Sequence, residues 1–299
     1  MDHSLYDYSA LPARPAYRWP GGAGLASFVV LFLEHWEFMS PEGAWRDPRM
    51  VGEFGSFSPD YRSWSQREYG LRVGIFRVIE ALRQAGIRPA VAANALAVQR
   101  LPHLVEVFNA WDCEWLGHGM ASTRMVHSGM SLDEQRAHVS GSLDILARCT
   151  GKRPQGWVSQ DWGTTPDTAR LLAEAGIRYT LDWSNDDQPY PLLTTPPLVA
   201  LPLSSEWDDV QCQWLRNLEP QVHTALAAAA FARLHAECHQ QQRAAVFGLA
   251  LHPWLCGMPS RISALRNLLA RLRAQSQVHW AAPGQLIDSF PLEPAHGLP

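Results

Sequence analysis

Lysine is nearly absent from this chain: Lys152 is the only one among 25 basic residues in 299, so the others are arginines. Acidic residues outnumber basic ones, and the net charge is −4 with a sequence pI of about 6.3. The sequence therefore lacks the basic excess that binds nucleic acid or an anionic membrane. We expect neither of these partners.

Paired cysteines are also lacking. The five cysteines are odd in number, widely spaced and without a Cys-x-x-Cys pair: Cys113, Cys149, Cys212, Cys238 and Cys256. This pattern argues against a disulfide framework or a thiolate zinc site and indicates a reducing compartment. No apolar run approaches the roughly 18 residues of a membrane span, and the first residues lack the basic start and apolar core of a signal peptide. The sequence predicts a cytoplasmic protein.

The chain does contain enough apolar sequence, 46% of 299 residues, for a sizeable core. No linker or shift in composition divides it. We expect one domain over residues 1–299, with an N-terminal extension at 1–20 and a flexible tail at 290–299.

Helix and strand signals alternate through the middle of the chain. The helical signals are an apolar repeat at 71–82 that stops at Gly86, a capping box at 131–134, the N-cap pair Thr165-Pro166, and an amphipathic run at 261–275. Strand-like pieces follow at 88–93 and 179–183, each opened by the tetrapeptide Ala-Gly-Ile-Arg. Such alternation predicts right-handed β–α units and a mainly parallel sheet. Two long irregular segments, 41–67 and 185–197, are expected to form lids or binding walls.

Three short apolar runs each end in a charged or imidazole side chain. The runs are 28–33, 115–117 and 247–251, and the residues that follow them are Glu34, His118 and His252. A run of this length is typical of a buried strand. Active sites of parallel α/β folds lie at the C-terminal ends of strands. The three ends therefore predict an enzyme rather than a binding module.

Motifs along nearly the whole chain resemble the NodB-like polysaccharide deacetylase superfamily (carbohydrate esterase family 4), in its branch of allantoinases and cyclic-imide hydrolases. They are Tyr6-Asp7-Tyr8, residues 34–38, Tyr69-Gly70, residues 72–74, residues 117–119, Gly151, Arg153-Pro154, Gly156-Trp157, Asp182-Trp183, residues 185–191 and residues 251–253. The resemblance implies an α/β fold: a single-domain distorted (β/α) barrel of about seven strands. It also implies a homo-oligomer such as a tetramer.

The family's catalytic positions are only partly kept. Its Asp-Asp pair, general base then metal ligand, matches Glu34 and His35, and its His-x-x-x-His metal pair matches His118 and Ser122. Its later histidine, the general acid, matches His252, and its orienting arginine matches Arg153.

Serine is a poor metal ligand, so a bound metal is left open. A divalent ion such as zinc would be held by His35 and His118, and Glu37, two residues after His35, is a further candidate ligand. No other cofactor is expected.

Opening a cyclic amide needs a base for the attacking water, a donor for the developing oxyanion and an acid for the leaving nitrogen. We assign Glu34 as the base, His252 as the acid, and His118 with His35 as the oxyanion donors. Further substrate contacts are expected from Trp36, Ser122, Trp157, Trp183, Asn185 and Asp186. Asp208-Asp209 matches an acidic position of the branch or is a solvated loop.

The leading prediction is a hydrolase of a small cyclic amide: allantoin, an imide or a hydantoin-like ring. Leu71, Ser122 and residues 158–163 depart from the allantoinase-like pattern, so the identity of the ring stays open. One alternative is a deacetylase of an N-acetylated sugar or small amide. Another is a small-ligand binder without catalysis.

Overall fold

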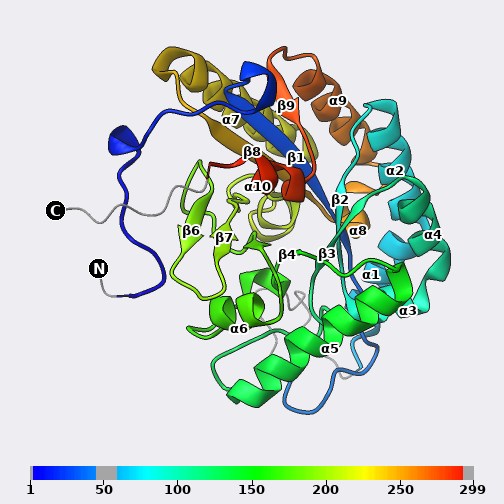
Figure 1. Cartoon of the computed structure of the whole chain (residues 1–299). Coiled ribbons are helices and arrows are strands. Elements are labelled where there is room, and N and C mark those ends of the chain that lie inside the picture. The colour runs from blue at the N-terminus through cyan, green and yellow to red at the C-terminus, as the bar shows by residue number, and fades with distance from the viewer. Residues whose placement is uncertain (1–2, 45–58, 292–299) are drawn as a thin grey trace.

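The computed structural model of the protein describes residues 3–44 and 59–291 (Figure 1). Its centre is one curled, mostly parallel nine-stranded sheet, with helices packed around the outside. The strand order is β6-β7-β5-β4-β3-β2-β1-β8, and β9 pairs with β1 off this path. The predicted α/β class and distorted barrel are confirmed, with nine strands rather than about seven.

Most strands are short. They are β1 (Leu25–Leu33), β2 (Ala90–Ala93), β3 (Glu114–Gly117), β4 (Gly156–Trp157), β5 (Tyr179–Thr180), β6 (Tyr190–Leu192), β7 (Leu198–Ala200), β8 (Ala245–Leu251) and β9 (Val278–Trp280). The α-helices are α1 (Tyr61–Tyr69), α2 (Ile75–Gln84), α3 (Ala95–Arg100), α4 (Pro102–Ala110), α5 (Leu132–Thr150), α6 (Thr168–Glu174), α7 (Pro220–Gln241), α8 (Pro253–Cys256), α9 (Ile262–Arg273) and α10 (Pro283–Ser289). None of the helices among the described residues is long and apolar enough to cross a membrane.

Strand β1 is buried along its whole length and pairs in parallel with β2, β8 and β9. A strand covered on both faces needs a continuous apolar sequence, which Leu25–Leu33 supplies. Its odd-numbered side chains, such as Leu31 and Leu33, pack in the outer core with α2, α7 and α9. Its even-numbered ones, such as Val30 and Phe32, pack in the barrel interior. This alternation fixes the side on which the next residues fall.

Several predicted element ends are confirmed. Gly86 takes a positive φ just after α2, and Ser131 forms the predicted capping box with Glu134 at the start of α5. One predicted helix start is wrong. Helix α6 begins at Thr168 with Asp167 as N-cap, so Thr165-Pro166 belongs to the preceding turn.

The two long segments also contain regular structure. Helix α1 already begins at Tyr61 inside the expected loop 41–67, whose residues 45–58 lie outside the described part. Strand β6 lies within 185–197 and pairs antiparallel with β7. Both segments are therefore less irregular than the sequence predicted.

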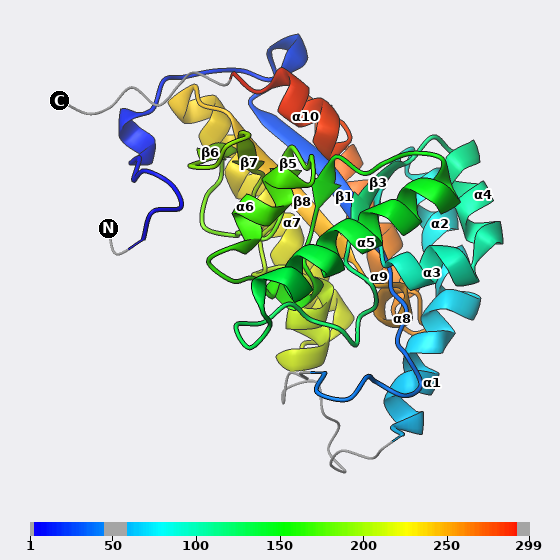
Figure 2. The ribbon, with the colours of Figure 1, turned by 60° about the horizontal axis from the view of Figure 1, so that its bottom comes forward.

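The barrel is open between its edge strands β6 and β8, and a loop spans this seam. Val246 N donates to Asp187 O at 2.8 Å, and Gln188 Nε2 donates to Ala244 O at 2.7 Å. The predicted N-terminal extension passes the start of β8, where Trp19 Nε1 donates to Ala245 O at 2.9 Å. Figure 2 shows this segment and α10 at one end of the barrel and α1 at the opposite end. The tail from residue 292 onward lies outside the described residues.

Helix α1 continues through a π-helical turn, Gly70–Gly74, into α2, and this turn packs directly on α8. A Cβ atom on Gly70 would lie 2.6 Å from Trp254 N, and one on Gly74 would overlap the carbonyl oxygen of Pro253. Only glycine allows two backbones to approach this closely. The approach fixes the turn that directly follows His252.

Candidate active site

Glu34 is the first residue after β1 and points into the barrel interior, as its even-numbered place in the strand dictates. Its side chain is only 7% exposed. Gln160 Nε2 donates to Glu34 Oε1 at 3.1 Å. Burial alone would raise the pKa of this carboxyl, but the adjacent His118 ring and the charge of His252 outweigh burial and lower the pKa to about 2. Glu34 is therefore a buried carboxylate.

His118 follows β3 and lies beside Glu34. Its Nδ1 lies 2.7 Å from the carbonyl oxygen of Val158, which can only accept, so Nδ1 carries a proton. The other ring nitrogen, Nε2, lies 3.6 Å from Glu34 Oε1 and has no hydrogen-bond partner, although the side chain is only 1% exposed. An unpartnered buried ring nitrogen beside a carboxylate is positioned for a ligand rather than for stability.

His252 follows β8, the neighbour of β1 in the sheet. Asp209 forms two hydrogen bonds with His252. His252 N donates to Asp209 Oδ2 at 2.8 Å, and His252 Nδ1 lies 2.6 Å from Asp209 Oδ1. The ring stacks on Phe32 at a centroid distance of 4.2 Å. Burial would lower the pKa of His252, but the charges of Asp209, Asp208 and Glu34 raise it to about 10. His252 is therefore an imidazolium at neutral pH, with Nε2 left free for a reaction.

Asn94, just after β2, connects the segments that follow β1 and β3. Its Nδ2 donates to His118 O at 2.5 Å, and its Oδ1 accepts from His35 N at 2.8 Å. Ser122 Oγ lies 2.9 Å from the same Oδ1 and 3.2 Å from Glu34 Oε1, so its one proton is shared between them. Ser122 is thus a hydrogen-bonding neighbour of the carboxylate.

His35 and Glu37 do not join this group. His35 points outward, with Nδ1 3.2 Å from Arg100 Nη1 on α3. Burial first, and then the Arg100 charge, lower the pKa of His35. Both oxygens of Glu37 are engaged by Arg124, at 2.5 and 2.9 Å. The structure therefore does not bring His35, His118 and Glu37 together as the conditional metal set expected, because Arg100 and Arg124 hold two of them elsewhere.

Among residues 3–44 and 59–291, one group of three side chains has ligand atoms close enough to hold a metal ion: Asp208, Asp209 and His252. Its donor chemistry fits a proton better than a metal. Both Asp209 oxygens already bond His252, so an ion would have to displace the Nδ1 proton. Asp208 Oδ2, 3.9 Å from His252 Nδ1, has no hydrogen-bond partner. Burial raises the pKa of Asp208 to about 7.

Of two further predicted tryptophan walls, Trp157 is a core residue and Trp183 is partly buried at the edge of a core cluster. Trp157 is 1% exposed and donates to Ser159 Oγ at 2.9 Å. Trp183 packs against the rings of Tyr6 and Tyr190. Trp36, in contrast, lies at the site end of β1, with its ring centroid 4.8 Å from Arg67 Cζ.

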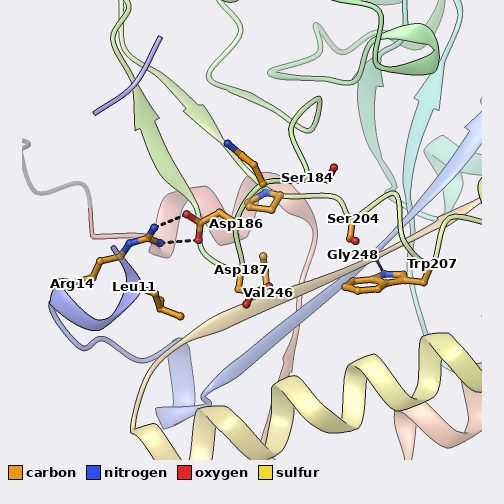
Figure 3. A pocket seen from close by; sticks show the side chains of 11 residues that line it. Leu11, Arg14, Ser184, Asp186, Asp187, Ser204, Trp207, Val246 and Gly248 are labelled. Atoms are coloured by element: carbon orange, nitrogen blue, oxygen red, sulfur yellow. Dashed lines mark hydrogen bonds and ion pairs between the residues drawn. The ribbon is translucent and has the colours of Figure 1, made fainter. Parts of the chain in front are cut away.

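Asn185 and Asp186 lie at the seam instead of beside Glu34. They line a cavity of 410 Å³ next to Val246, Gly248 and Trp207 (Figure 3). Asp186 accepts two bonds from Arg14, at 2.7 and 2.6 Å, and Asn185 bonds the hydroxyls of Tyr6 and Tyr190. Val246 lies six residues before His252 in β8, which corresponds to roughly 20 Å. The structure therefore does not bring these two residues to the strand-end site.

Arg153 also has another role than predicted. It pairs with Asp144 of α5 at 2.6 Å, and both side chains are exposed. The residue that orients His252 is Asp209, whose functional interpretation the sequence had left open. Asn94 and Gln160 were missed, although Asn94 could have been found, since it directly follows the apolar strand β2 as Glu34 follows β1.

Comparison with solved structures defines the class. Puue allantoinase superposes with a TM-score of 0.80 at 25% identity, covering 95% of this chain and 97% of that one. A probable polysaccharide deacetylase from Pseudomonas aeruginosa PAO1 gives a TM-score of 0.79 at 24% identity, covering 92% and 94%. No family model and no curated protein matches the chain.

The fold is that of the NodB-like polysaccharide deacetylases. The superfamily resemblance predicted from the motifs is thereby confirmed. Both neighbours are named as hydrolytic enzymes, which supports a hydrolase of C–N bonds.

Proposed function

We propose that the protein opens a small cyclic amide by hydrolysis of its C–N bond. One observation carries the proposal: a buried carboxylate and a buried imidazolium, Glu34 and His252, stand at the ends of adjacent strands beside the unpartnered His118 Nε2. Base, acid and oxygen-binding group are the parts that water attack on an amide requires.

Glu34 is the base, and His252 controls its strength. The His252 charge lowers the pKa of Glu34, and the Glu34 charge raises the pKa of His252. When Glu34 takes a proton from water, its charge is lost and His252 becomes a stronger acid. When His252 gives up its proton, Glu34 becomes a stronger base. Each proton transfer therefore favours the other, and both groups avoid the weakness that their resting pKa values would impose.

His252 donates its Nε2 proton to the leaving ring nitrogen, while Asp209 holds Nδ1 and the backbone N–H. This arrangement keeps Nε2 aimed and stabilises the cation, as a carboxylate does for histidine in hydrolase triads. In its doubly protonated form, His118 donates Nε2–H to the oxygen of the scissile carbonyl while Nδ1–H stays on Val158 O. Val158 O holds the opposite ring nitrogen and so fixes that orientation.

No step above requires a metal, because among the described residues neither the outward His35 nor the serine at position 122 gives His118 a second imidazole ligand beside it. Asp208, Asp209 and His252 are the residues that would hold a divalent ion, and such an ion would supply Lewis acidity. A chelator distinguishes the two cases.

A panel of rings tests the function. Allantoin, hydantoin and succinimide are incubated with the protein, with and without chelator, and ring opening is followed by mass spectrometry. We expect at least one ring to open in the presence of chelator. Acetate release from an N-acetylated sugar would favour a deacetylase instead. Ring binding without any product would favour the non-catalytic alternative.

A cytoplasmic location and a homo-oligomer, for example a tetramer, stay predictions. Analytical ultracentrifugation measures the second directly.

A further inference from the structure

We propose that Arg67 binds a carboxylate of the substrate, so that the ring opened by this protein bears an anionic side group. This inference rests on the proposed function and narrows its substrate class. Arg67 lies on α1 and is only 4% exposed. Its Nε and Nη1 atoms are buried and have no hydrogen-bond partner among residues 3–44 and 59–291.

Buried guanidinium groups normally bond their N–H donors, because an unpaired buried cation is costly. Here the neighbouring carboxylate Glu68 is committed to Arg100, at 2.6 and 2.7 Å. Burial lowers the pKa of Arg67 to about 10, and the charges of Glu34, Asp161 and Asp60 partly offset this. The side chain is therefore cationic at neutral pH and lies within the field of the Glu34 carboxylate.

Three tryptophans enclose the guanidinium. Its Cζ lies 3.2 Å from the ring centroid of Trp254, 4.8 Å from that of Trp36 and 5.2 Å from that of Trp214. Trp36 and Trp254 each follow a proposed catalytic residue by two positions, and Trp214 belongs to the π-helical segment Val210–Leu215 after Asp209. The cage is thus built from the same segments that deliver Glu34, His252 and Asp209.

Among the described residues, the buried atoms of the cage that have no partner are all hydrogen-bond donors. The indole N–H groups of Trp36 and Trp254 are buried and unpartnered, like two nitrogens of Arg67. A ligand that satisfies them must bring acceptor oxygens close together, and a carboxylate does so with a charge that matches the guanidinium. A neutral ring would leave the cation unpaired. We therefore assign this group to a carboxylate beside the scissile amide.

Binding is measured with the Glu34→Gln variant, which separates recognition from turnover. The probes are hydantoin and its carboxylate-bearing analogue hydantoin-5-acetate, compared by calorimetry. We expect the carboxylate probe to bind about 10–100-fold more tightly, because hydrogen bonds between charged partners are the strong ones. Adding Arg67→Met is expected to abolish this preference, and Arg67→Lys to retain part of it. Arg100→Met, a neighbouring arginine that pairs with Glu68, is the matched control and keeps the preference.

Three results would overturn the assignment. Equal affinity for the two probes is one. An unchanged preference after Arg67→Met is another. In the third, Arg67→Met lowers the melting temperature and weakens both probes equally, while Arg67→Lys restores both equally, which identifies a purely structural arginine. Hydantoate, the ring-opened form of hydantoin, is a further probe. If the affinity for hydantoate falls after Arg67→Met and the affinity for hydantoin-5-acetate does not, Arg67 binds the product and the proposal is wrong.

The two proposals can fail separately. Charge-selective binding without ring opening by the unmodified protein would leave Arg67 assigned and refute the hydrolase. Ring opening by the unmodified protein, together with equal affinity for the neutral and the carboxylate probes, would support the hydrolase and refute the assignment of Arg67.

Discussion

The seam between β6 and β8 and the strand-end site both contain buried polar groups, but these groups differ in whether they have hydrogen-bond partners. At the seam, Asp186 accepts two hydrogen bonds from Arg14 and Asn185 bonds two tyrosines, so these groups satisfy one another, although the neighbouring Tyr17 Oη is buried without a partner among the described residues. At the strand-end site, His118 Nε2, Asp208 Oδ2 and two Arg67 nitrogens are buried without partners. Since burying an unpaired polar atom costs stability, the second pattern marks function and the first marks structure.

The largest effect is expected at Glu34. Glu34→Gln removes the base but keeps the shape, and we expect kcat/KM to fall by about 1,000-fold. Steady-state kinetics on the best ring of the panel measure this. Glu37→Gln is the matched control, because Glu37 pairs with Arg124 outside the site, and its effect should be small. Comparable losses in both variants would remove the distinction between them.

Asp209→Asn is expected to shift the pH profile. Because the Asp209 charge raises the pKa of His252 to about 10, its loss moves the alkaline limb of kcat/KM down toward the ordinary value of 6.5. At pH 9 this lowers the rate by about 100-fold. The stabilisation from charged His252 is present in full below pH 6.5 and is lost as the pH rises through about 10. Asp208→Asn should shift the limb less, since Asp208 lies 3.9 Å away. An unmoved limb in Asp209→Asn would contradict the role of His252.

Ser122→Ala is expected to have a moderate effect. It removes one hydrogen-bond donor from Glu34 and leaves Gln160 in place. We expect kcat/KM to fall by about 10-fold, which corresponds to one hydrogen bond to a charged group. Substituting histidine at this position and adding zinc offers a contrast: a gain in activity would show that metal chemistry is accessible to this site.

At the seam, stability should change and catalysis should not. Arg14→Met breaks the pair with Asp186, and we expect a loss of about 1–2 kcal/mol in the free energy of unfolding. Denaturant unfolding measures the loss, and kinetics at low temperature should show kcat unchanged. A drop in kcat without a loss of stability would place the seam cavity in the reaction and cancel the comparison.

Much of the fold could be predicted from local patterns. The apolar runs at β1 and β8, Gly86 after α2 and the Ser131 capping box each follow from the residues themselves. The proposed reactive groups Glu34, His118 and His252 were found in the same way, because the end of an apolar strand is visible in the sequence.

Side-chain direction was harder to predict. His35 was assigned to the site because it matches the family's metal-ligand position, yet its ring lies against Arg100 of α3 instead. Asn185 and Asp186 were grouped with the site through the family motif, and only the three-dimensional course of the chain places them against Val246. Asp209 acts across 43 residues of sequence, which no local pattern encodes.

The close packing of Gly70 and Gly74 on α8 has a consequence for how this protein tolerates sequence drift. An added methyl group there would have to push the backbone of Pro253 and Trp254 away. That displacement would misplace His252 and one wall of the Arg67 cage together, although neither glycine touches a reacting atom. We therefore expect substitutions at Gly70 or Gly74 to abolish the proposed activity as effectively as substitutions at the charged groups, although every charged group stays in the sequence.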